Sequence, residues 1–240
     1  LTTLYFHVMR VNPDAPQAPE RDRFVLSKGH CTPALYSTMA QRGFFPLEEL
    51  KQFRRIEGHM SGHAEMRHVK GVDMSTGSLG QGISAAVGMA LAGKADGRDY
   101  RVYALLGDGE IEEGQVWEAA MAAAKYRLDN LCAVVDVNGL QIDGATADVM
   151  PSEPLDQKFE AFNWNVIRVD GHDYAALAEA FAAAAACKGK PTVLLARTVK
   201  GKGVSFMEGD YGWHGKAPNA EQYEKARAEL AARVAELEGK

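Results

Sequence analysis

Apolar runs alternate with amphipathic stretches along most of this chain, and the alternation predicts strands that alternate with helices. Short runs rich in Val, Leu and Ile have the length of buried strands. Stretches with apolar residues at helical spacing lie between them. The predicted strands are 101–106, 131–137, 166–169 and 192–197, and the predicted helices are 1–10, 34–42, 46–53, 79–94, 113–127, 155–162, 174–187 and 221–237.

This order of elements predicts an α/β fold, a doubly wound parallel sheet with helices on both faces. Loops are expected at 12–22, 57–74 and 201–218, where Pro, Gly and polar residues gather. The sequence shows neither an internal repeat nor a low-complexity linker. We therefore predict that residues 1–240 form a single domain.

Composition narrows the classes of protein that fit. An apolar fraction of 46% and a charged fraction of 25% are ordinary for a soluble globular protein. The net charge of −5 and the lack of a basic tract argue against general nucleic-acid binding. No apolar run approaches the roughly 18 residues of a membrane helix. The three cysteines form no CxxC pair, which favours a reduced, cytoplasmic location.

Oxygen ligands follow two consecutive predicted strands. Gly107-Asp108-Gly109 ends the first, and Asn138 ends the second. Open parallel sheets bind ligands at the carboxyl ends of their strands. The Asp108 carboxylate, the Asn138 amide oxygen and the carbonyl of Leu140 would suit a hard cation such as Mg²⁺, Ca²⁺ or Mn²⁺, shared with phosphate oxygens. Asp-Gly pairs also occur in ordinary turns, but the second oxygen ligand at a neighbouring strand end disfavours that alternative.

The pattern of GDG, a spacer and then Asn resembles the signature of proteins that bind thiamine diphosphate through a metal ion. Three further segments narrow the resemblance to transketolases. Residues 22–30 read DRFVLSKGH, residues 62–63 and 76–83 read GH and TGSLGQGI, and residues 213–216 read WHGK. All stand in the order typical of the family. The resemblance covers nearly all 240 residues and corresponds to the first of the family's three domains.

The resemblance implies a role for each matching residue. Magnesium and thiamine diphosphate are the expected cofactors, with Asp108, Asn138 and Leu140 as metal ligands. His30 would contact the sugar, and His63 would face both the cofactor and the donor sugar, although Ala64 stands where the family commonly has Pro. The remaining cofactor contacts implied are Gly77, Ser78 and Leu79 at the aminopyrimidine, Gly107 and Gly109 at the diphosphate, His214 near the diphosphate and thiazolium, and Lys200 in the cleft.

Simpler interpretations of some of these residues stay open. Gly77-Ser78 could be an ordinary helix cap, and Lys200 could belong to a flexible basic loop. Histidines and a glutamate within residues 59–68 could form a zinc site. We favour the transketolase interpretation, because no cysteine supports zinc.

Four glutamates follow the GDG turn. In transketolases, matching glutamates connect distant active sites at a subunit interface, which implies that role for Glu113 and Glu118. Glu110 and Glu112 are expected to be solvated residues of an acidic helical turn.

The leading hypothesis is the diphosphate-binding half of a split transketolase, which moves a two-carbon ketol unit between sugar phosphates. The Glu that activates the cofactor lies in the family's second domain. We therefore expect a C-terminal subunit to supply it in an α₂β₂ heterotetramer. The family's upstream helix and SGHPGG-like loop do not precede residue 1, so an N-terminal segment is expected to be missing.

Three alternatives belong to other classes. The E1 α subunit of 2-oxo acid dehydrogenases also carries GDG and Asn, but lacks the DRFVLSKGH-like and WHGK segments. A deoxyxylulose phosphate synthase fragment would differ around His214. A non-catalytic binding module would not need the intact Asp108, Asn138 and histidines.

Overall fold

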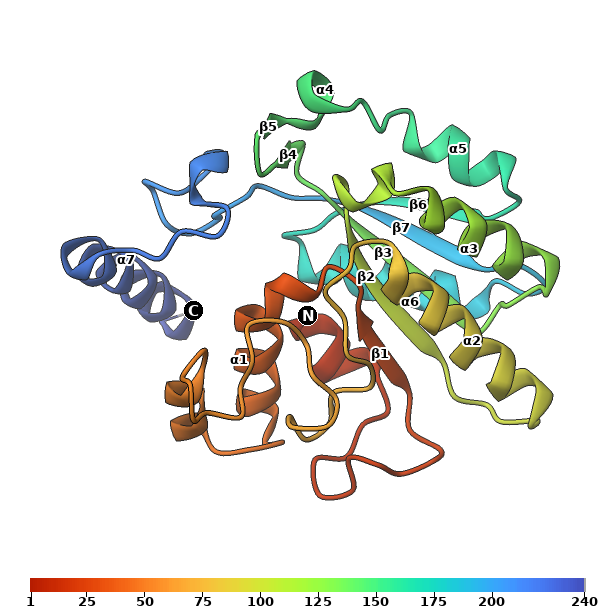
Figure 1. Cartoon of the computed structure of the whole chain (residues 1–240), viewed down its shortest axis with the longest axis horizontal. Coiled ribbons are helices and arrows are strands. Elements are labelled where there is room, and N and C mark those ends of the chain that lie inside the picture. The colour runs from red at the N-terminus through yellow and green to blue at the C-terminus, as the bar shows by residue number, and fades with distance from the viewer. Residues whose placement is uncertain (240) are drawn as a thin grey trace.

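The fold is built around a five-stranded parallel sheet. The computed structural model describes residues 1–239, and its strand order is β1-β2-β3-β7-β6 (Figure 1). The strands are β1 (Arg23–Leu26), β2 (Val102–Gly107), β3 (Leu131–Val137), β6 (Asn165–Asp170) and β7 (Thr192–Arg197). A separate antiparallel pair, β4 (Leu140–Gln141) and β5 (Gly144–Ala145), follows β3.

Helices cover both faces of this sheet, as predicted. One face carries the π-helical turn Leu4–Val8, α1 (Thr32–Arg42) and α6 (Tyr174–Ala186). The other carries α2 (Gln81–Ala95), α3 (Gly114–Lys125) and α5 (Leu155–Ala161). The remaining helical segments are α4 (Thr146–Val149), α7 (Ala220–Glu238) and the 3₁₀ turns Gly29–Cys31, Leu47–Gln52, Glu110–Glu112 and Tyr211–Trp213.

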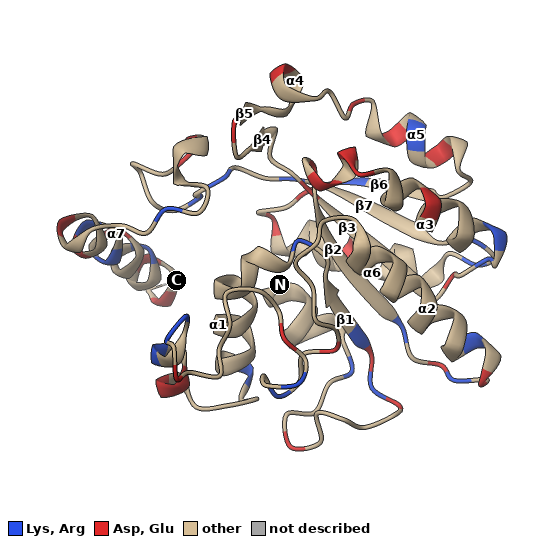
Figure 2. Cartoon of the chain, viewed as in Figure 1, with Lys and Arg blue, Asp and Glu red and all other residues tan. Residues whose placement is uncertain are grey.

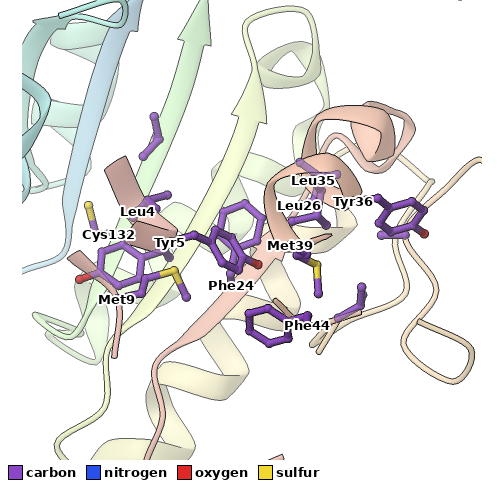
Figure 3. Close-up of a cluster of buried hydrophobic side chains, with 14 of the residues drawn as sticks. Leu4, Tyr5, Met9, Phe24, Leu26, Leu35, Tyr36, Met39, Phe44 and Cys132 are labelled. Carbon is purple, nitrogen blue, oxygen red and sulfur yellow. The ribbon is translucent and has the colours of Figure 1, made fainter. Parts of the chain in front are cut away.

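The two-residue period of the strands divides the core between these faces. On β3, Cys132 and Val134 point to the α1 and α6 side, whereas Ala133 and Val135 point to the α2 and α3 side. Alternate side chains of a strand face opposite ways. Figure 3 shows the first cluster, in which Tyr5 and Phe24 pack edge to face with ring centroids 5.6 Å apart. The doubly wound prediction is confirmed.

Some predicted elements need correction. The first strand, Arg23–Leu26, is absent from the predicted strands, because four residues are too few to show a period. The helix predicted at 79–94 begins only at Gln81, because Gly80 adopts a φ of 79°, outside helical geometry. The helix predicted at 1–10 is reduced to a π-helical turn. The β4–β5 pair is a further element that the sequence pattern does not predict.

The last helix stands apart from the sheet. Figure 1 shows α7 at the end of an extended arm, and its ribbon carries charges of both signs in Figure 2. Asn219 and Gln222 form a capping box at its start. Glu229 accepts hydrogen bonds from the Ser205 backbone N–H and hydroxyl, both at 2.7 Å. The arm therefore packs mainly on its own loop, and the single-domain prediction stays a prediction. Within residues 1–239, no helix combines the length and apolar character needed to cross a membrane.

Candidate functional site

Asp108 organises the carboxyl ends of β2 and β3. The residue is only 3% exposed. Its Oδ2 accepts the backbone N–H of Asn138 at 2.9 Å and that of Gly139 at 2.6 Å. Its Oδ1 accepts the N–H of Gly109 at 3.0 Å. Burial, with the nearby Asp136 carboxylate, raises the pKa of Asp108 despite these bonds. The Asp108 carboxylate therefore links the ends of β2 and β3, the two positions at which the sequence predicts oxygen ligands.

The oxygens at this edge fit a hard cation. Each carboxylate or amide oxygen has two acceptor positions. Oδ1 of Asp108 takes one hydrogen bond, as does the amide oxygen of Asn138, from the Leu140 N–H at 3.1 Å. Each oxygen therefore keeps an acceptor position for Mg²⁺. Gly139 has a φ of 73° and no heavy atom within 4 Å of where its Cβ would lie, so the space beside it is open.

Three predicted histidines come from separate loops at the same sheet edge. His30 lies on the 3₁₀ turn after β1, and its ring centroid is 5.1 Å from that of His214. A Cβ on Gly77 would lie 3.3 Å from Cδ2 of His63. Burial, reinforced by His214 and Lys28, lowers the pKa of His30 to about 4. Burial and Lys200 lower the pKa of His214. Near neutral pH both imidazoles are therefore uncharged.

The loops that carry these histidines are tied together by backbone contacts. The Ala64 N–H donates to the Gly29 carbonyl at 3.2 Å, and the Thr76 N–H donates to the Ala64 carbonyl at 3.0 Å. A Cβ on Gly29 would lie 2.6 Å from the backbone carbon of Thr76, so only Gly fits there. A cavity of about 400 Å³ opens beside this junction, lined by Ser61, Gly62, His63, Ala64, Glu65, Met74, Ser75, Thr76, Gly77, Ser78, Gln81 and Gly82.

A partly buried ion pair links three strand ends and is not predicted by the sequence pattern. The Lys28 ammonium pairs with Asp136, whose other oxygen accepts the Thr198 hydroxyl. The lysine stem crosses the end of β2, where its Cδ lies 3.5 Å from the position of a Cβ on Gly107. The one signal of this ion pair in the sequence is Asp136, a charged residue near the end of the apolar run 131–137.

A comparison with known families decides which family this chain belongs to. The family described as "Transketolase, thiamine diphosphate binding domain" matches residues 1–236. The chain belongs to the transketolase family. It is 48% identical over 230 residues to the 6-deoxy-6-sulfo-D-fructose transketolase subunit SqwG of Clostridium sp. (strain MSTE9), covering 96% of this chain and 84% of that subunit. It is 46% identical over 238 residues to an apulose-4-phosphate transketolase subunit of Phocaeicola vulgatus, covering 99% and 84%.

A solved transketolase shares the fold. The crystal structure from Campylobacter jejuni superposes with a TM-score of 0.87 at 34% identity. The match covers 95% of this chain and 37% of that one. The chain therefore spans most of the subunit-type transketolases and about a third of this longer one.

The other predicted site residues of this transketolase chain differ in exposure. Ser78, Glu113 and Glu118 are exposed, whereas Leu79 and Lys200 are half-buried. The two glutamates have no salt-bridge partner within residues 1–239. Their interface role stays a prediction.

The structure bears on two further predictions, the solvated turn at Glu110 and the zinc site. Glu110, expected in a solvated turn, is 2% exposed, so that prediction is wrong. The zinc alternative gains no support: His59 pairs with Glu49 at 3.0 Å and Glu65 with Arg67 at 3.1 Å. Throughout the described chain, no three His, Cys, Asp or Glu side chains gather as a metal site would require.

The depressed pKa of His30 gives a first testable expectation. Titration of His30 followed by ¹H–¹⁵N NMR should show a pKa near 4, well below the usual value for histidine. Because the folded state disfavours the charged ring, His30 favours unfolding as pH falls from the ordinary histidine range toward 4. A titration of His30 in the ordinary histidine range would contradict the packing of His30 against His214.

Proposed function

We propose that this chain is the cofactor-binding half of a two-subunit, cytoplasmic transketolase. In this proposal it holds magnesium and thiamine diphosphate, and a C-terminal subunit completes the active site in an α₂β₂ heterotetramer. The juxtaposition of Asp108 and Asn138 with three histidines at one sheet edge is the observation that carries the proposal. The free thiols of Cys31, Cys132 and Cys187 are consistent with a reducing compartment.

The proposed chemistry divides between the cofactor and the chain. Bound thiamine diphosphate would supply a nucleophilic carbon and an electron sink for cleavage of a C–C bond. Asp108, Asn138 and the Leu140 carbonyl would hold Mg²⁺, which offsets the charge of the diphosphate. Gly77, Ser78 and Leu79 would form the wall beside the aminopyrimidine.

The uncharged ring of His30 suits the sugar-binding side of this site. A neutral imidazole both donates and accepts a hydrogen bond, so it can orient a sugar hydroxyl and move its proton. His30 and His63 are assigned to the sugar, and His214 to the diphosphate side. The buried Nδ1 of His214 has no hydrogen-bond partner within the described chain, consistent with a group that a bound molecule satisfies.

The relatives support a partner subunit but not one particular sugar. Two similar proteins are named as transketolase subunits, for 6-deoxy-6-sulfo-D-fructose and for apulose 4-phosphate. Because similar chains carry different substrate names, we propose sugar phosphates only as a class. The family match disfavours the dehydrogenase, synthase and non-catalytic alternatives.

Replacement of the sugar-facing histidines tests this assignment. His30→Ala and His63→Ala should each lower kcat of the reconstituted enzyme by about 100-fold, the scale of a lost general acid or base. The Kd for thiamine diphosphate should change much less, because neither residue is assigned to the diphosphate. Steady-state kinetics and calorimetry measure the two quantities. His68→Ala is the control, because His68 is exposed and lies on the same loop as His63. Equal losses of turnover and cofactor affinity would reject the sugar-binding role.

Replacement of an interface glutamate tests the assembly. Glu118→Gln should weaken association of the two subunits or coupling between active sites, since the charge is assigned to a shared interface. Sedimentation velocity measures the first, and cofactor-binding isotherms measure the second. Glu179→Gln neutralises an exposed glutamate on α6, over the opposite face. If both variants assemble and bind cofactor like the wild type, Glu118 has no interface role.

A further inference from the structure

Glu110 is a buried carboxylate that the proposed reaction does not use. It lies on the 3₁₀ turn after the GDG sequence and is 2% exposed. Burial raises its pKa, and three hydrogen bonds oppose that rise. An ionised group in such a place costs folding free energy unless donors surround it. The groups that donate hydrogen bonds to Glu110 therefore indicate what the residue does in the fold.

Three donors from three segments converge on this carboxylate. Oε1 accepts the Ser27 hydroxyl at the end of β1 and the Gly80 N–H at 3.0 Å. Oε2 accepts the Gly107 N–H at 3.1 Å, at the end of β2. Gly80 directly follows Leu79, and Gly107 directly precedes Asp108. One side chain thus joins the segment assigned to the aminopyrimidine with the segment assigned to the metal.

The contact with Gly80 also fixes the start of α2. Gly80 has a φ of 79°, and a Cβ there would lie 2.9 Å from Cβ of Glu113. Gly80 therefore fits closely against the loop that follows GDG. The positive end of the α2 dipole faces the Glu110 charge, which strengthens this link.

We propose that Glu110 is a positioning residue that sets the separation of the two walls of the cofactor site. With all three bonds in place it is too enclosed to contact a substrate, so it acts through Gly80 and Gly107. This inference rests on the proposed cofactor function, since it assigns a purpose to the distance between Leu79 and Asp108.

Glu110→Gln is the sharpest test, because it preserves shape while removing charge. In either orientation of the new amide, its NH₂ group faces the N–H of Gly80 or of Gly107. Hydrogen exchange on the chain alone should speed up in residues 77–82 and 105–109, with β7 unchanged. The Kd of the reconstituted enzyme for thiamine diphosphate with Mg²⁺ should rise by about tenfold, the effect of one lost charge-assisted hydrogen bond. At saturating cofactor, kcat should stay near the wild-type value.

Two other variants complete the test. Glu112→Gln removes a neighbouring negative charge and none of these bonds, so exchange in residues 77–82 should stay at the wild-type rate. Ser27→Ala removes one donor, leaves the carboxylate, and should raise the Kd by a smaller factor even if Glu110→Gln folds poorly.

Unchanged exchange at both segments, or faster exchange with a wild-type cofactor Kd, would overturn the positioning role. If the wild-type complex itself fails to bind thiamine diphosphate, the proposed function fails. The exchange measurement would then still decide whether Glu110 holds the two segments.

Discussion

Asp108→Asn should weaken binding of Mg²⁺ and thiamine diphosphate to the reconstituted enzyme by more than about 100-fold, the upper range for disturbing even an outer-sphere contact of a metal site. The change removes the anionic ligand. It also turns an amide NH₂ toward the N–H groups of Gly109 or of Asn138 and Gly139, which now donate to the carboxylate. Calorimetry with the wild type as reference measures the loss.

A nearby acidic residue provides the control. Asp143 is exposed in the β4–β5 turn, so Asp143→Asn removes the same charge without touching the proposed ligands. Wild-type cofactor affinity in Asp108→Asn would reject the metal assignment.

The same site should give a pH dependence of defined sign. Metal binding needs the carboxylate, and the pKa of Asp108 is raised by burial and by Asp136. Cofactor affinity should therefore fall with decreasing pH, beginning at a higher pH than an ordinary aspartate would give. In the chain without cofactor, the same raised pKa makes protonation of Asp108 favour the folded state. A fall in pH should therefore weaken cofactor binding, whereas its effect on Asp108 should stabilise the chain without cofactor.

The second large effect is dependence on a partner subunit. Purified alone, this chain should show no detectable ketol transfer, and mixing with its C-terminal partner should restore it. This chain alone does not cover the candidate site, because His63, Ser78 and Glu113 lie exposed around it. Met121 on α3 and Leu91 on the neighbouring α2 are 53% and 37% exposed, giving apolar surface on these two helices for a partner to cover.

A coupled assay and light scattering measure this dependence. Activity should saturate when the two subunits are equimolar, and the complex should have about twice the mass of one heterodimer, as α₂β₂ requires. A chain that transfers ketol units unaided would contradict the two-subunit proposal.

Local patterns predict the sheet but not its polar links. The runs forming β2, β3 and β7 are long and apolar enough to be recognised individually, and their parallel pairing follows from the intervening helices. β1 has four residues, so its place at the sheet edge is set by tertiary contacts.

The residues of the candidate site also divide into those that local sequence patterns predict and those that they do not. Asp108 and Asn138 are predictable because each ends a strand. The burial of Glu110 is not, because its partner Ser27 lies 83 residues away. The Lys28–Asp136 pair joins residues 108 apart. Such contacts leave no periodic signal in the sequence, and only the folded chain brings them together.

In the proposed function, Asp108 and Asn138 hold the metal that anchors thiamine diphosphate at the carboxyl ends of β2 and β3. The most direct test is anomalous diffraction from crystals of the reconstituted complex grown with thiamine diphosphate and Mn²⁺. We expect one strong manganese peak at roughly 2.2 Å from an oxygen of each residue, a typical distance for such a hard cation. A cofactor bound with its metal elsewhere, or Asp108 and Asn138 oxygens without metal in a cofactor-bound complex, would contradict it.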